Sequence, residues 1–345
     1  MPVKGAAYRY SQSFYYFRCY HNLAMKKFLK PILFLIYDIL LVPFSYLYLP
    51  FLKQTRRFGV QNFPLHKKAF RRLGVFPLQD HYYEPQFTFP ACFDASVKRN
   101  LLIDFRIESQ IENMGKLQYA DELEQLPQKD KSKPGSTPLF YVNNPNFGPG
   151  DSDMYYLMIR NYKPRKIIEI GSGFSTLAAL EAIRKNNAEG FPVELTCIEP
   201  FETGWLDKCT EIRLIRKKLE EIDLSFFASL EVNDILFIDS SHVIRPENDV
   251  LYEYLQLLPK IGKGVLIHIH DIFSPRNYRQ DWITEEVRLW DEQYLLEAFL
   301  YYNQSFQIEY SLNYLKNDHY EETSKILLNL THESQPASFW MRKIE

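Results

Sequence analysis

The chain has few cysteines, and no pattern among them builds a metal site or a disulfide framework. Four occur in 345 residues, at Cys19, Cys92, Cys197 and Cys209, and none forms a CxxC pair. Their spacing matches no zinc-binding arrangement, so free thiols in a reducing compartment are expected. The first 25 residues also lack an apolar run that ends in a small-residue cleavage site, which argues against a secretory signal peptide. We therefore expect a cytoplasmic protein.

An excess of charge of either sign is also missing. The 41 Lys and Arg residues nearly balance the 43 Asp and Glu residues, which leaves a formal net charge of −2. Nucleic-acid-binding proteins usually carry a basic patch or a high isoelectric point, so nucleic acid is not an expected partner. Hydrophobic residues make up 46% of the chain, which is enough for a sizeable core.

Long hydrophobic runs are rare, with one exception between Phe28 and Leu52. This run is long enough to span a bilayer, although Asp38, Pro43 and Pro50 interrupt it. Basic residues stand on both sides of it, at Lys26, Lys27, Lys30, Lys53, Arg56 and Arg57. Three interpretations stay open: peripheral contact with the anionic inner face of the membrane, a true span, or packing on the protein's own core or on a partner subunit.

The apolar run belongs to a predicted helical N-terminal extension, residues 1–137. The end of this extension, residues 127–137, reads PQKDKSKPGST and is polar and rich in Lys, Pro and Ser. Such a composition indicates an exposed linker or surface loop. A second domain is therefore expected to cover residues 138–345.

Apolar strands alternate with helices in this second domain. Strands are predicted at 166–170, 193–198, 212–215, 234–238 and 264–269, and helices at 152–161, 176–185, 203–210, 249–258 and 283–299. Two later strands are predicted at 306–312 and 338–343. The alternation predicts an α/β fold, a parallel sheet that is doubly wound by helices.

A glycine-containing turn, EIGSGFST, follows the first of these strands. Gly171 permits a tight turn, and Gly173 lets the backbone approach a ligand closely. Ser175 and Thr176 stand at the helix start, where free backbone N–H groups can meet a ligand. Glu199 ends the next strand, where a carboxylate can bind both ribose hydroxyls of a nucleoside cofactor. These features suit S-adenosylmethionine and NAD alike.

Four blocks in order resemble one bacterial group of class I S-adenosylmethionine-dependent methyltransferases: EIGSGFST, CIEP, DILFIDSSH and GVLIHIHDIF. The resemblance implies the seven-stranded, Rossmann-like methyltransferase sheet with an antiparallel last strand. It also implies that Glu169, Gly171, Ser172 and Gly173 form the cofactor turn and that Glu199 binds the ribose. Ser175 stands where the family has a third glycine. The loop near 221–224 is expected to pass the adenine, and FGPGDS (147–152) to close over the methionine end.

Acids and histidines follow the fourth and fifth strands, where the acceptor should meet the cofactor. Asp239 and His242 stand at one end, and His270 and Asp271 at the other. In one interpretation His242 or His270 is the general base. In the other, Asp239 and Asp271 hold a divalent ion such as Mg²⁺ that acidifies a substrate hydroxyl, which resembles catechol O-methyltransferase.

The leading hypothesis is an O-methyltransferase that acts on a small-molecule or glycan-type acceptor. The first alternative is an NAD-dependent Rossmann oxidoreductase, although no Tyr/Lys or Cys/His centre stands at the expected strand ends. The second is a non-catalytic, cofactor-binding scaffold that docks at the membrane through residues 28–52.

Overall fold

The computed structural model describes residues 23–78, 94–133 and 137–345, except 202, 285 and 287. The chain divides into two units, residues 1–88 and 89–345, which are described separately. The domain boundary predicted between residues 137 and 138 stays a prediction. Cys197 is buried and Cys209 partly exposed, both as free thiols, while Cys19 and Cys92 lie outside the described residues.

The first unit is helical. Helix α1 (Leu23–Arg57) is followed by a short 3-10 turn η1 (Val60–Asn62) and by helix α2 (Pro64–Leu73). The segment 30–57 of α1 contains an 18-residue window with a mean hydropathy of 2.0, and it is long and apolar enough to cross a membrane by length and composition. Helix α2 ends at Gly74, which takes the left-handed conformation typical of a helix C-terminus.

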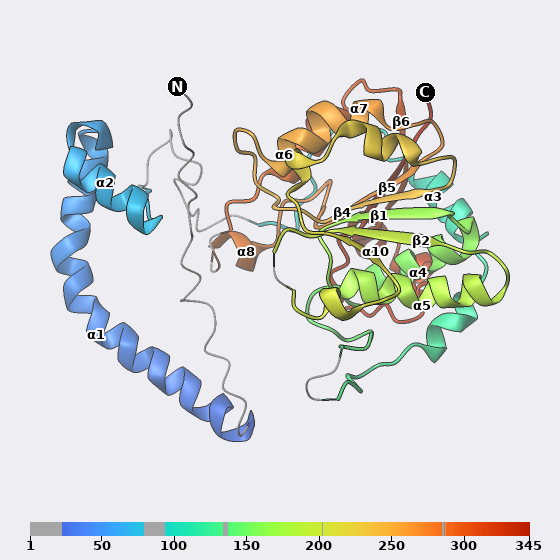
Figure 1. The fold of residues 1–345 in the computed structure, drawn as a ribbon, viewed down its shortest axis with the longest axis horizontal. Helices are drawn as coiled ribbons and strands as arrows, with labels where there is room; N and C mark the ends of the chain where they lie inside the picture. Colours follow the sequence, from blue (N-terminus) through green and yellow to red (C-terminus); the bar gives the residue numbers. More distant parts are fainter. Residues whose placement is uncertain (1–22, 79–93, 134–136, 202, 285, 287) are drawn as a thin grey trace, which may run out of the picture. The chain divides into compact units, whose positions relative to one another are not determined.

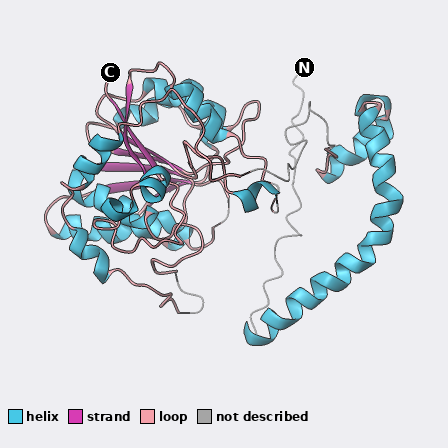
Figure 2. Cartoon of the chain, turned by 180° about the vertical axis from the view of Figure 1, so that it is seen from behind, coloured by secondary structure: helices cyan, strands magenta, loops and turns pink. Residues whose placement is uncertain are grey.

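The second unit is a seven-stranded sheet covered by helices on both faces (Figures 1 and 2). The strands are β1 (Lys166–Ile170), β2 (Glu194–Ile198), β3 (Arg213–Ile215), β4 (Ile235–Ile238), β5 (Leu266–Ile269), β6 (Phe306–Ser311) and β7 (Phe339–Lys343). Their order is β3-β2-β1-β4-β5-β7-β6. Strands β1 to β5 are parallel, and β7 is antiparallel to both β5 and β6. The predicted fold class is confirmed.

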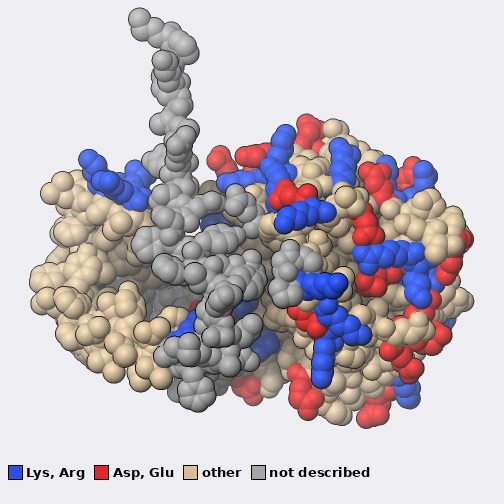
Figure 3. Space-filling model, turned by 60° about the horizontal axis from the view of Figure 1, so that its bottom comes forward, with Lys and Arg blue, Asp and Glu red and all other residues tan. Residues whose placement is uncertain are grey.

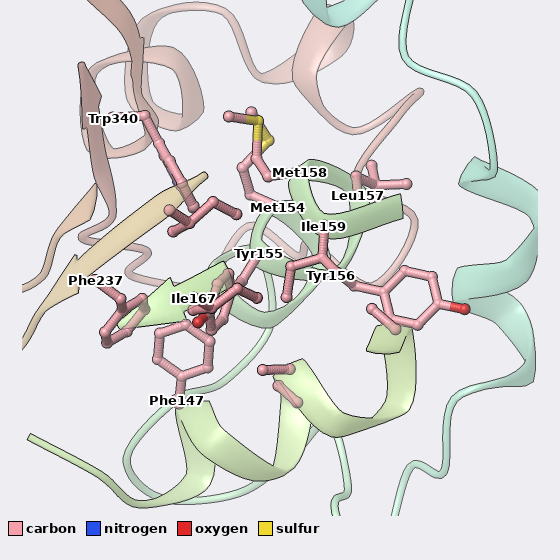
Figure 4. Close-up of a cluster of buried hydrophobic side chains, with 14 of the residues drawn as sticks. Phe147, Met154, Tyr155, Tyr156, Leu157, Met158, Ile159, Ile167, Phe237 and Trp340 are labelled. Atoms are coloured by element: carbon pink, nitrogen blue, oxygen red, sulfur yellow. The ribbon is translucent and has the colours of Figure 1, made fainter. Parts of the chain in front are cut away.

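Side chains of the strands alternate between two cores. Ile167 points into the core beneath helices α4 (Asp151–Tyr162) and α5 (Phe174–Ala188), and Figure 4 shows it beside Tyr155 and Phe237. Ile168 points into the opposite core, beneath α6 (Asp249–Tyr252), the π-helical turn η6 (Glu253–Leu257) and α7 (Leu258–Lys260). Because both faces are covered, the strands are apolar almost throughout.

Two predicted helices differ from the structure. The helix expected at 203–210 is a single 3-10 turn, η3 (Leu206–Lys208). The helix expected at 283–299 is divided into α8 (Gln280–Thr284) and α9 (Glu292–Leu300). Between them the guanidinium of Arg288 lies 4.1 Å from the ring centre of Trp282 and 4.5 Å from that of Trp290. Trp290 also packs against His242, whose ring centre lies 4.4 Å away, and such tertiary contacts can override helix propensity.

The remaining elements connect these layers. They are α3 (Ile107–Met114), η2 (Ala120–Gln125), η4 (Leu219–Glu221), η5 (Leu224–Ser229), α10 (Leu312–Asp318) and α11 (Tyr320–Thr323). Among them η4 matters most for function, because it stands where the chain leaves β3 at the carboxyl edge of the sheet.

Candidate cofactor and active site

A cavity of about 240 Å³ opens at the carboxyl ends of β1, β2 and β4. Gly171 lines it after β1, Glu199 after β2 and Asp239 after β4. Leu219 and Asn248 help to close the sides. In a parallel sheet this edge, next to the point where the strand order reverses, is where ligands bind.

The turn after β1 needs glycine at residue 171 for two reasons. Its φ is +78°, and a Cβ atom there would lie 1.9 Å from the carbonyl oxygen of Asp239. At Gly173 the reverse holds, since a Cβ would meet nothing within 4 Å. Gly171 therefore brings the β1 and β4 ends together, and Gly173 leaves open space beside the backbone.

Glu169 and Thr176 lie behind the turn, inside the protein. The Thr176 hydroxyl donates to Glu169 Oε2 over 2.6 Å and accepts from the Gly173 N–H over 3.1 Å. Burial raises the pKa of Glu169 to about 7. Ser175 is also buried beside this carboxyl. These three predicted cofactor residues are thus placed to shape the turn, and none of them lines the cavity.

Glu199 holds the turn from the side of β2. Its carboxylate accepts from the Ser172 N–H over 3.3 Å and from the Phe201 N–H over 2.8 Å. It lines the cavity and remains partly accessible, so it can bind a polyol there. The next wall contains Lys218, Leu219 and Glu220, which directly precede the segment predicted to pass the adenine.

The segment predicted to close over the methionine end is tied into the fold. Phe147 is buried against Tyr155 and Phe237. The Asp151 carboxylate accepts from the backbone N–H groups of Ala337 and Ser338, over 2.9 and 2.8 Å. Its contact with a cofactor stays a prediction.

The four predicted catalytic residues meet at the ends of β4 and β5. His242 Nε2 lies 3.2 Å from Asp239 Oδ1 and 3.6 Å from Asp271 Oδ2. His270 Nε2 lies 3.6 Å from Asp271 Oδ1. His242 and Asp271 both adopt left-handed backbone, with φ of 60° and 57°. Such conformations cost about 1–3 kcal/mol each and persist where the surrounding structure imposes them.

The charged groups in this cluster shift one another's pKa values. Burial opposes a charge on His242, but hydrogen bonds with Asp239 and Glu292 outweigh it and raise the pKa of the imidazole well above its usual value. Burial also works against the Asp239 carboxylate, yet His270 and His242 lower its pKa. Burial raises the pKa of Asp271. The raised pKa therefore favours the protonated form of the His242 imidazole.

Sequence reasoning missed the residues that hold His242 from behind. Its Nδ1 lies 2.8 Å from Glu292 Oε2, and the Tyr254 hydroxyl donates to Glu292 Oε1 over 3.1 Å. The Trp290 ring packs 4.4 Å from the imidazole. No local signal marks Glu292, because it stands fifty residues beyond His242 in a segment with an ordinary helical composition.

The donor set fits a divalent cation. One ligand atom from each of Asp239, His242 and Asp271 lies within 4.8 Å of the others. Two carboxylates suit Mg²⁺, and an imidazole broadens the set toward transition metals. His242 would have to lose its proton to take part. His268, by contrast, is buried against Phe237 and bonds to Ser338, as expected of a core histidine.

The strand order, the antiparallel β7 and the glycine turn facing an acid after β2 define the architecture of class I methyltransferases. Residues 168–272 match the model of a methyltransferase domain. This match confirms the resemblance that the four sequence blocks predicted, and it contains the turn, Glu199 and the acid–histidine cluster.

One curated relative is an uncharacterized protein of Archaeoglobus fulgidus, 36% identical over 101 residues. The match covers 28% of this chain and about 45% of that protein's length. Among solved structures, an O-methyltransferase from Bacillus cereus in complex with SAH is 14% identical, with a TM-score of 0.33 and coverage of 69% of this chain and 91% of that one. A methyltransferase from Archaeoglobus fulgidus is 15% identical, with a TM-score of 0.32 and coverage of 56% and 95%. Because these TM-scores are low, we assign the fold from the strand order of the sheet and not from the solved structures.

Proposed function

We propose that this protein transfers a methyl group from S-adenosylmethionine to a hydroxyl of a small-molecule or glycan-type acceptor. One observation carries the proposal: the cavity at β1, β2 and β4 shares Asp239 with the acid–histidine cluster at β4 and β5. A nucleoside cofactor in the cavity would therefore direct its reactive end toward that cluster.

The residues of the cavity suit the cofactor. Glu199 lines the cavity and would accept hydrogen bonds from the ribose hydroxyls. The open backbone at Gly173, two residues after the cavity-lining Gly171, would accommodate the methionine part. When bound, the cofactor would supply a sulfonium methyl group that the acceptor oxygen attacks in line, with S-adenosylhomocysteine as the leaving group. The chain's own task is to align the oxygen, exclude water and remove a proton.

Proton removal falls to the acid–histidine cluster. Glu292 and Tyr254 fix the imidazole of His242, so Nε2 faces Asp239 and Asp271. A metal held by Asp239 and Asp271 would lower the pKa of the acceptor hydroxyl. Without a metal, a carboxylate of the cluster would receive the proton, because the raised pKa of His242 favours an imidazole that already carries one. Both mechanisms use the same residues.

Glu199→Gln is expected to weaken binding of S-adenosylhomocysteine by about 10- to 100-fold, because a charged acceptor of two hydroxyl hydrogen bonds is replaced by an amide. Isothermal titration calorimetry measures this loss. Glu194→Gln is the matched control, since Glu194 stands exposed at the opposite end of the same strand. Binding of NAD in place of S-adenosylhomocysteine would instead support an oxidoreductase.

His242→Ala is expected to lower kcat by about 100-fold or more while the affinity for S-adenosylhomocysteine stays within about two-fold. The acceptor for this assay comes from incubation of labelled S-adenosylmethionine with host extract. His332→Ala, at an exposed histidine far along the chain, is the control. Equal turnover of His242→Ala and wild type would remove His242 from the mechanism.

Chelation separates the two mechanisms. If Asp239 and Asp271 hold a metal, EDTA abolishes turnover, and added Mg²⁺ or Mn²⁺ restores it. Activity that persists after exhaustive chelation assigns the proton to the cluster alone. Cofactor binding without any methyl transfer would favour a non-catalytic scaffold.

A further inference from the structure

Helix α1 exposes apolar side chains in every direction around its axis. Ile32, Leu33, Phe34 and Leu35 are consecutive, and each is between 49% and 61% exposed. Four consecutive residues point to all sides of an α-helix, so no polar face exists there. In the most apolar 18-residue window of α1, no residue is buried among the described residues. A helix that is apolar all round belongs in a core or in a membrane, and the described residues of its own unit do not bury it.

We propose that α1 spans a lipid bilayer and anchors the protein there. Its apolar part, residues 31–52, is about 33 Å long at ~1.5 Å per residue, close to the ~30 Å hydrocarbon core of a bilayer. Lys30 precedes this part and Lys53 follows it. An amphipathic helix that lies flat on a membrane would need a polar face, which this segment lacks.

The interruptions that the sequence shows are compatible with a span. Pro31, Pro43 and Pro50 lie inside a helix that the structure describes as continuous, and proline is tolerated in membrane helices. Asp38 is the single charged residue between Pro31 and Leu52. A lone acid opposes insertion, but many Leu, Ile, Val and Phe side chains of the same segment favour it.

Helix α2 supplies a second, independent indication of lipid. Lys67, Lys68, Arg71 and Arg72 occupy one side of this ten-residue helix, and Leu65, Ala69 and Leu73 the other. Leu65 is 82% exposed and Leu73 74% exposed. A basic amphipathic helix directly after a span fits the surface of an anionic leaflet. We therefore place α2 on the lipid surface at the C-terminal end of α1.

The first experiment is fractionation of cells that express the full chain. Wild type is expected to stay in the membrane pellet through washes with high salt and with alkaline carbonate. A triple variant, Leu35→Lys with Leu40→Lys and Leu47→Lys, is expected to reduce the pelleted fraction by at least ~10-fold, since a lysine inside a span is strongly unfavourable. Far-UV circular dichroism of the soluble variant checks that the α/β unit remains folded.

The matched control carries the same charges elsewhere. Val232→Lys, Leu255→Lys and Tyr302→Lys replace side chains that are 65%, 64% and 92% exposed in the second unit. This control should pellet as wild type does. Wild type that salt or carbonate releases would overturn the span. A soluble wild type that light scattering shows to be an oligomer would also overturn it, because α1 would then pack on a second copy.

Purified full chain in phosphatidylcholine vesicles, with or without phosphatidylglycerol, tests the role of α2. Wild type should prefer the anionic vesicles. Replacing Lys67, Lys68, Arg71 and Arg72 together by Gln should shrink that preference by at least ~10-fold, whereas an unchanged preference would remove α2 from the lipid surface.

Discussion

Gly171→Ala is expected to destabilise the protein by at least about 3 kcal/mol and to abolish binding of S-adenosylhomocysteine. The added methyl group would lie 1.9 Å from the Asp239 carbonyl oxygen, on a backbone with a φ of +78°. The obstructing atom is backbone of the β4 end, so neither a rotamer change nor a flexible side chain can relieve the clash. Either β1 or β4 must move, and the cavity depends on both ends.

Gly173→Ala, in the same turn, is the matched control for Gly171→Ala. An added Cβ there meets nothing within 4 Å, and its φ of −171° lies outside the left-handed region that favours glycine. The variant should unfold in denaturant as wild type does. If a cofactor occupies the open space, its affinity should nevertheless fall by about 10-fold or more, as overpacking of a contact predicts.

The pair of glycine variants separates stability from binding. Unfolding midpoints and calorimetric affinities measured side by side provide both quantities. Wild-type affinity in Gly173→Ala would show that the ligand does not approach this turn. Wild-type stability in Gly171→Ala would show that the β1 and β4 ends are not packed as the structure describes.

Glu169→Gln is expected to flatten the dependence of stability on pH. Burial raises the pKa of Glu169 from an ordinary value of 4.5 to about 7. The folded protein therefore binds more protons than the unfolded chain between these values, so the free energy of unfolding falls as pH rises through that window. At about 1.4 kcal/mol per pKa unit, the loss approaches about 3 kcal/mol by pH 8.

Urea denaturation at intervals from pH 4 to pH 8 measures the effect. Wild type should lose stability relative to Glu169→Gln as pH rises, because the glutamine stays neutral and can still accept the Thr176 hydrogen bond. Glu194→Gln, at an exposed position, should keep the wild-type profile. Parallel curves for wild type and Glu169→Gln would contradict a buried carboxyl with a raised pKa.

Local patterns were sufficient to predict the sheet and its turn. Apolar runs of strand length indicate buried parallel strands, and the glycine pair after β1 together with an acid after β2 indicates a nucleoside site. The cluster at the ends of β4 and β5 was also predictable in outline, because the carboxyl ends of neighbouring parallel strands share one edge. The family resemblance added the antiparallel β7 and the choice of cofactor.

The partners of these residues were not predictable. Glu169, Ser175 and Thr176 stand in the cofactor motif, yet their side chains turn inward, because strand alternation and the helix start decide direction only once the sheet is packed. Glu292 reaches His242 from a separate helix. The helix expected at 283–299 is divided, and Trp290 in the break packs on His242, forty-eight residues earlier in the chain.

The amino-acid sequence by itself determined the strands, the order of the motifs, the need for glycine in the turn and the length of the apolar helix, because each depends on neighbours along the chain. Only the tertiary structure decided which carboxylates meet His242 and that they raise the pKa of its imidazole. Distances and desolvation between residues far apart in the chain set those outcomes, and both exist only after the layers have packed.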